Sequence, residues 1–252
     1  AVKPVMQIPA VNLSWTASVL SNLPAPKVSK RPLTFEDLNQ AYGFVLYRTH
    51  LTGGKTGVLK LKDLRDYAII MINGHTVGKL DRRLRQDSFT IKLPAGKVTL
   101  DILVENLGRI NFGKYMLQNK KGITDRVLFN AVELTGWQMY SLPFNSVAHI
   151  KYQHTAYHGT APVIRKGSFN LKTVADTYLD MRNWGKGVVW VNGHNLGRYW
   201  NIGPQQTIYL PAEWLHRGNN DIVVFELLKP QQAQISAIKT PILNQLARAG
   251  DR

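Results

Sequence analysis

The sequence predicts an all-β chain built from two tandem antiparallel jelly-roll (β-sandwich) domains. Short runs of β-branched and aromatic residues alternate with turns rich in Gly, Pro and Asn, and no credible helical pattern reaches ten residues. Two Asn-Gly dipeptides, at 73–74 and 192–193, follow strand-like runs and are typical of tight hairpin turns. The hairpins lie 119 residues apart (192 minus 73), which indicates an internal repeat.

The repeat extends beyond the hairpins. Residues 90–95 (TIKLPA) correspond to residues 207–212 (TIYLPA). Residues 101–105 correspond to 221–226 with one extra residue, which aligns Glu105 with Glu226. A repeat of this length predicts two copies of one fold unit, and the 252 residues can bury two ordinary cores.

The segment 1–41 resembles a connector. Five prolines interrupt every long element, which leaves residues 11–15 as one plausible strand. Residues 34–40 are compatible with a single helical turn, with Thr34 as the cap and Asp37 at the capping-box position.

Strand patterns fill the rest of the chain. The first jelly roll is expected over residues 42–142, with a loop at 108–113 whose polar and aromatic content is unusual for a simple connection. The second is expected over residues 143–246 and contains the second hairpin. Residues 247–252 form a basic tail.

The chain is basic, with 32 Lys and Arg against 16 Asp and Glu and a formal net charge of +16. Such a charge favours the binding of a polyanion, but the basic residues are dispersed along the chain and no nucleic-acid-binding motif accompanies them. A solvated surface, or a docking face for an acidic partner, is the favoured reading, and no nucleic-acid partner is expected. No apolar stretch is long enough for a membrane helix, so no membrane partner is expected either.

No catalytic constellation stands out. Glycoside hydrolysis needs two carboxyl groups across one bond, and the chain has five Glu, none with a recognisable partner: Glu36, Glu105, Glu133, Glu213 and Glu226. Cys is absent, and the seven His lack the spacing of a zinc protease, so neither a metal site nor a cofactor is expected. Aromatic residues are more promising because sugar rings stack on them, although packing explains Trp190, Tyr199 and Trp200 as well.

Three motifs carry a family resemblance. Residues 42–49 (YGFVLYRT), 104–113 (VENLGRINFG) and 191–200 (VNGHNLGRYW), in this order, resemble the β-galactosidases of glycoside hydrolase family 35. The likeness runs from Pro24 to about Leu246. In that family a catalytic (β/α)8 barrel carries both catalytic glutamates and is followed by galactose-binding-like jelly rolls. This chain resembles the part after the barrel, since about 250 residues are needed for a barrel alone.

The resemblance has implications for the site. The loop carrying Arg109, Asn111 and Phe112 would lie near the substrate mouth of the barrel, where relatives commonly have Tyr in place of Phe112. Arg198, Tyr199 and Trp200 would pack at a domain interface.

The expected function is that of a noncatalytic region of a β-galactosidase, whose retaining reaction cleaves terminal β-galactosides. Its expected partners are the barrel and a β-galactoside glycan, and the resemblance favours a periplasmic or secreted location. The alternative is a free-standing, lectin-like galactoside-binding module.

Overall fold

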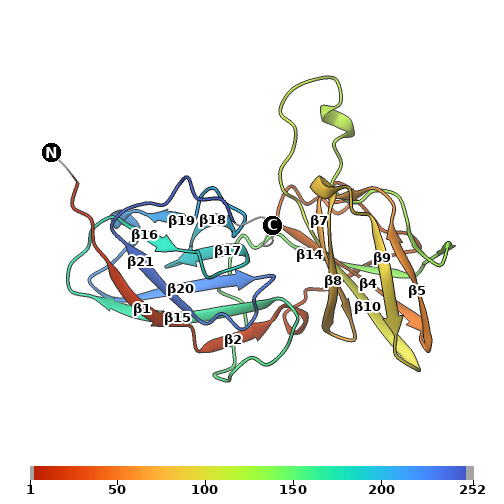
Figure 1. Ribbon diagram of the computed structural model, residues 1–252, viewed down its shortest axis with the longest axis horizontal. Helices are drawn as coiled ribbons and strands as arrows, with labels where there is room; N and C mark the ends of the chain where they lie inside the picture. The colour runs from red at the N-terminus through yellow and green to blue at the C-terminus, as the bar shows by residue number, and fades with distance from the viewer. Residues whose placement is uncertain (1–2, 248–252) are drawn as a thin grey trace. The chain divides into compact units, whose positions relative to one another are not determined.

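The computed structural model describes residues 3–247 and divides the chain into two compact units (Figure 1). The central unit is Leu23–Asn145, and the terminal unit combines Ala1–Asn22 with Ser146–Arg252. Within the described residues, helical structure is limited to 3-10 turns of three residues each: η1 (Val19–Ser21), η2 (Arg82–Leu84), η3 (Met116–Gln118) and η4 (Ala212–Trp214). The prediction of an all-β fold is confirmed.

The central unit contains two main antiparallel sheets and a small two-stranded one. The six-stranded sheet has the order β3 (Lys27–Ser29), β14 (Trp137–Leu142), β4 (Phe44–Thr52), β10 (Lys97–Glu105), β7 (Tyr67–Ile72) and β8 (His75–Asp81). The four-stranded sheet has the order β13 (Val132–Glu133), β12 (Val127–Phe129), β5 (Lys55–Leu61) and β9 (Ser88–Leu93). The short pair is β11 (Gly122–Ile123) with β6 (Leu64–Arg65).

The core of the central unit lies between its two main sheets. Ile70 and Ile102 from the larger sheet and Leu59 and Ile91 from the smaller one belong to a single buried cluster. Alternate residues of a strand point to opposite faces, so each sheet contributes every second side chain to this core.

The terminal unit is also a pair of antiparallel sheets. The five-stranded sheet has the order β18 (His194–Trp200), β17 (Lys186–Val191), β20 (Gly218–Glu226), β15 (Val163–Leu171) and β2 (Trp15–Ser18). The four-stranded sheet has the order β1 (Ile8–Asn12), β21 (Gln234–Ile238), β16 (Thr177–Asp180) and β19 (Thr207–Leu210). Val189 and Val224 from the first sheet and Leu179 and Ala237 from the second share one buried cluster.

The two hairpins predicted from Asn-Gly have the same geometry. Asn73 and Gly74 adopt φ of 49° and 80°, and Asn192 and Gly193 adopt 49° and 82°. Positive φ at both central positions defines the type I′ turn that suits a right-twisted ribbon. Each hairpin also contains a bulge, and the residues skipped in the register, Val77 and Leu196, are again 119 positions apart (196 minus 77). The repeat is therefore present in three dimensions.

The register corrects one detail of the repeat. Tyr67 and Lys186 are equivalent positions 119 residues apart (186 minus 67). Glu105 pairs with Tyr67, whereas Glu226 pairs with Gly187, the residue after Lys186. Val104, which pairs with Ala68, is therefore the equivalent of Glu226, and the alignment of Glu105 with Glu226 is wrong by one residue. The segment between residues 207–212 and this strand has five more residues than its counterpart in the first copy (122 minus 117). A shift of one residue exchanges the two faces of a strand, so the two carboxylates point in opposite senses.

The segment expected to be a connector, up to position 41, contains more structure than predicted. β1 pairs with β21 and β2 pairs with β15, so both strands are integral to the terminal unit, whereas β3 pairs with β14 in the central unit. The predicted turn is present, because the Asp37 carboxylate accepts the Thr34 amide (3.0 Å) and the Asp37 amide donates to the Thr34 hydroxyl (3.2 Å). Of the expected basic tail, residues 248–252 lie outside the described residues.

Candidate functional site

The connection between β10 and β11, residues 106–121, is the longest loop of the central unit and contains the predicted residues Arg109, Asn111 and Phe112. Figure 1 shows this segment, with η3, extending away from the strands of its unit. Loops of this length are uncommon in compact domains and are often functional. We refer to residues 106–121 as the β10–β11 loop.

Arg109 anchors the base of this loop. Its guanidinium donates to the Ala41 carbonyl at 3.1 and 3.2 Å and to the Asn119 carbonyl at 3.1 Å, and it forms an ion pair with Glu36. The Ile110 amide donates to the Asn119 side chain at 3.1 Å, which ties the two arms of the loop together. Arg109 is therefore engaged mainly in holding the loop.

Glu36 completes this anchor from outside the loop. Its second carboxylate oxygen accepts the Lys121 amide at 3.1 Å. Partial burial alone would raise the pKa of Glu36, but the hydrogen bonds from the Lys121 amide and the Arg109 guanidinium outweigh it and lower the pKa below its ordinary value of 4.5. Glu36 therefore has a structural partner on each oxygen.

The tip of the β10–β11 loop is apolar and exposed. Phe112 is 88% exposed and Leu117 is 92% exposed. Neighbouring exposed apolar side chains are Ile110, Tyr115 and Met116. Asn111 is also exposed. Contiguous exposed apolar side chains commonly mark a surface that contacts another molecule or domain.

A basic hollow of about 750 Å³ lies beside the base of the loop, and its lining includes Arg82, Arg85, Arg109 and Lys121. The acidic member of the described lining is Asp66, which accepts hydrogen bonds from the Lys121 ammonium (2.7 Å) and the Leu107 amide (3.0 Å). Glu36 pairs with Arg109, Asp81 pairs with Arg83, and Asp66 is shared by Lys121 and Arg82 (3.4 Å), so the hollow keeps an excess of positive charge.

The second predicted group, residues 198–200, belongs to the terminal unit and divides between exposed and buried positions. Arg198 is exposed and Trp200 is half-buried, with the Lys186 ammonium 4.2 Å from its ring centroid. Tyr199 is 5% exposed and belongs to the core cluster of its own unit, where it meets Trp184 edge to face at 6.3 Å. The structure therefore places Tyr199 within the unit's own core.

Tyr199 contacts the buried carboxylate of Glu226, which the sequence identified only as a repeat position. Glu226 is fully buried and accepts the Tyr199 hydroxyl at 2.9 Å. It also accepts four backbone amides, those of Gly185, Lys186, Leu228 and Lys229, at 2.7–3.3 Å. Glu226 thus joins the start of β17 to the end of β20 and has a structural role.

Neither a metal centre nor a membrane span was found in the described part of the chain. Across residues 3–247, no group of three or more His, Cys, Asp or Glu side chains is arranged to hold a metal ion. Nor does any helix in that range have the length and apolar character needed to cross a membrane.

Comparison with known proteins places the chain in one family. Residues 32–143 match the model of the β-galactosidase first all-β domain, and residues 162–220 match the β-galactosidase galactose-binding domain. A β-galactosidase from Xanthomonas manihotis is 45% identical over 81% of this chain and 34% of its own length. The human β-galactosidase-1-like protein 2 is 36% identical over 86% of this chain and 35% of its own length.

The chain spans about a third of the length of these relatives. Among solved structures, a lectin from Pleurotus ostreatus in complex with GalNAc covers 92% of this chain and 79% of its own, with a TM-score of 0.27 and 13% identity, which is too distant to bear on function. One family match falls in each unit of the fold. The chain therefore belongs to the β-galactosidase family, of which it carries the first all-β domain and the galactose-binding domain.

Proposed function

We propose that the chain is the noncatalytic β-domain region of a glycoside hydrolase family 35 β-galactosidase, and that the β10–β11 loop borders the substrate mouth of a catalytic (β/α)8 barrel. The reaction of the whole protein is the hydrolysis of terminal β-galactosides, in the periplasm or outside the cell. The observation that carries this proposal is the combination of an anchored loop base with an exposed apolar tip at Phe112.

The geometry of the loop supports this role. Phe112 is 88% exposed, so burial within its own fold does not stabilise this side chain. The hydrogen-bonded base of the loop fixes the position at which Phe112 can contact a partner. An aromatic face suits the C–H surface of a sugar ring or of an aglycone, the group released on cleavage. Phe112 offers stacking but no hydroxyl, so its contribution is to apolar contact. The exposed Arg198 and the half-buried Trp200 are the proposed residues for packing between domains.

A chimera tests the proposal. The chain replaces the matched third of the Xanthomonas relative, and hydrolysis of lactose is measured with and without the Phe112→Ala substitution. Loss of a stacking contact worth about 1 kcal/mol is expected to raise KM by about fivefold with little change in kcat. Val132→Ala is the matched control, because Val132 is also exposed, at 67%, and lies on β13, outside the β10–β11 loop.

The proposal fails if the unsubstituted chimera folds but does not hydrolyse lactose. It also fails if Phe112→Ala and Val132→Ala have the same kinetic constants.

The chain by itself is expected not to hydrolyse β-galactosides. Glu36 is paired with Arg109, Glu133 with Arg31 at 2.7 Å, and Glu226 is saturated by five donors. Hydrolysis requires one carboxyl group that is held protonated and another that faces the same anomeric carbon. A purified chain that cleaves a chromogenic β-galactoside, and loses this activity on replacement of one glutamate, would contradict this expectation.

A further inference from the structure

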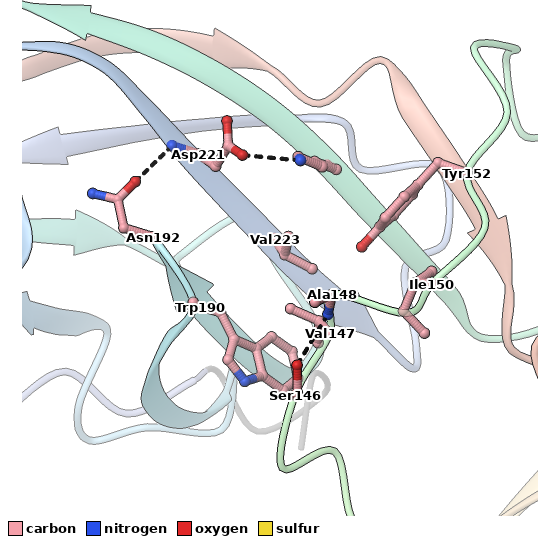
Figure 2. Close-up of a pocket in the computed structure, with 11 residues that line it drawn as sticks. Ser146, Val147, Ala148, Ile150, Tyr152, Trp190, Asn192, Asp221 and Val223 are labelled. Carbon is pink, nitrogen blue, oxygen red and sulfur yellow. Dashed lines mark hydrogen bonds and ion pairs between the residues drawn. The ribbon is translucent and has the colours of Figure 1, made fainter.

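A hollow of about 510 Å³ lies in the terminal unit, on the face of the five-stranded sheet opposite the core (Figure 2). Ile222 and Val224 of β20 point into the core cluster, so Asp221 and Val223 point to the other face. Residues 146–152 close the hollow from one side. Every lining residue belongs to the terminal unit.

The floor of the hollow is apolar. Trp190 is 1% exposed, Val223 6% and Ile150 7%. In Figure 2 the side chains of Trp190, Val223 and Ile150 lie below Asp221. A buried apolar floor of this kind favours a ligand with one apolar face.

The polar side of the hollow is an ion pair with unused hydrogen-bonding capacity. The Lys166 ammonium lies 2.9 Å from the Asp221 carboxylate, and their side chains are 37% and 41% exposed. The Asp221 amide donates to the Asn192 side chain at 2.9 Å, which fixes the backbone at this point, and Asn219 approaches the carboxylate only at 3.4 Å. An ammonium has three donors and a carboxylate about four acceptor positions, so each can bind further hydroxyl groups.

Tyr152 supplies the decisive observation. Its hydroxyl oxygen is buried, yet it has no hydrogen-bond partner among the described residues, and Figure 2 shows it directed into the hollow. Burial, and secondarily the negative charge of Asp221, raise the pKa of Tyr152, so the phenol is kept neutral. A buried hydroxyl without a partner is costly, and a ligand hydroxyl would remove that cost.

We propose that this hollow binds one neutral sugar unit of a glycan through Asp221, Lys166 and Tyr152. Two adjacent sugar hydroxyls donate to Asp221 and accept from Lys166, a third hydrogen-bonds to the Tyr152 phenol, and the C–H face of the ring covers Val223 and Ile150. The ion pair is locally neutral, which disfavours an anionic ligand. The proposal names residues that no comparison assigns, and it does not depend on the role proposed for the β10–β11 loop.

Binding of lactose and cellobiose to the complete chain tests the proposal, by saturation-transfer NMR and calorimetry. At least one disaccharide is expected to bind saturably. Asp221→Asn should weaken that binding about tenfold or more, because it removes a charged acceptor and disrupts the ion pair. Tyr152→Phe removes one neutral hydrogen bond and should weaken binding about two- to tenfold.

Asp87→Asn is the matched control. Asp87 also forms an ion pair with a strand lysine, Lys60, at 3.0 Å. The side chains of Asp87 and Lys60 are 47% and 41% exposed, similar to those of Asp221 and Lys166, but this pair lies in the central unit. Unchanged tryptophan fluorescence establishes that each variant is folded. The proposal is overturned if neither disaccharide binds saturably. It is equally overturned if Asp221→Asn weakens binding no more than Asp87→Asn does.

Discussion

The contact between Tyr199 and Glu226 provides a quantitative prediction about the terminal unit. Tyr199→Phe removes a single hydroxyl that lies 2.9 Å from a fully buried carboxylate. Hydrogen bonds to charged groups contribute roughly 1.5–3 kcal/mol, and Glu226 retains four amide donors after the substitution. We therefore expect the free energy of unfolding to fall by about 2 kcal/mol.

Glu226→Gln should cost more. In glutamine an NH₂ group replaces one carboxylate oxygen, and this group cannot accept a hydrogen bond. The Oε2 atom of Glu226 accepts both the Gly185 amide and the Tyr199 hydroxyl. The Tyr199 hydroxyl can turn to the Phe225 carbonyl at 3.0 Å, but the buried Gly185 amide loses its acceptor, at roughly 1–3 kcal/mol. The hydrogen bonds to the other oxygen also lose a charged acceptor, so the total cost is about 2–5 kcal/mol. This is a large fraction of the stability of an ordinary domain, roughly 5–15 kcal/mol.

Urea unfolding followed by tryptophan fluorescence measures both changes, and hydrogen exchange of the β17 and β20 amides assigns them to the terminal unit. Tyr178→Phe is the control, because the Tyr178 hydroxyl makes no hydrogen bond among the described residues; its substitution should change stability by less than about 0.5 kcal/mol. If Tyr199→Phe costs no more than Tyr178→Phe, or if Glu226→Gln is tolerated, Glu226 does not hold the two strands together.

Two further predictions concern the central unit. Arg48 binds Asp101 through two hydrogen bonds of 2.7 and 3.1 Å, and Asp101 is 1% exposed. Asp101→Ala should therefore lower the free energy of unfolding by about 3–5 kcal/mol. A loss below about 1 kcal/mol in urea unfolding would show that the pair is dispensable. The pKa of Glu36 is lowered in the fold, so its stabilisation of the β10–β11 loop is present above pH 4.5 and is lost as the pH falls through the folded pKa. Glu36→Gln should therefore accelerate hydrogen exchange of residues 107–121 at neutral pH but not well below pH 4.5, and an equal acceleration at both pH values would refute the ionic anchor.

The local features of the fold were predictable from the sequence. Asn-Gly after a β-branched run specifies a type I′ hairpin because both residues tolerate positive φ, and both hairpins have this turn. The repeat predicted two units, and both are antiparallel sandwiches. These successes depend on residues that lie close together in the chain.

Long-range pairing was not predictable in the same way. The partner of β2 is β15, with Trp15 opposite Lys166, and no local pattern near Trp15 identifies a partner so distant in sequence. The register of β20 relative to β10 is equally hidden, and an alignment error of one residue reversed the face assigned to Glu226 relative to Glu105. Register is set by packing across the sheet, which a single sequence does not display.

The candidate site was predicted only in part. The composition of residues 108–113 identified the loop, and the exposure of Phe112 agrees with a surface role, which remains a prediction. The anchor between Arg109 and Glu36 joins two segments that are far apart in the sequence and required the structure. The hollow at Tyr152 also required it, because the three side chains assigned to the ligand come from three separate segments.

The division of the terminal unit into two chain segments has a consequence for biosynthesis. Ile8 of β1 pairs with Ala237 of β21, so the first strand emerges from the ribosome long before its partner. At roughly 5–20 residues per second, β1 waits on the order of 10–45 s with its edges unsatisfied. All strand partners of the central unit lie within positions 23–145, so it can fold during this interval. Translation speed and chaperone binding to β1 and β2 should therefore govern the yield of the terminal unit far more than that of the central one.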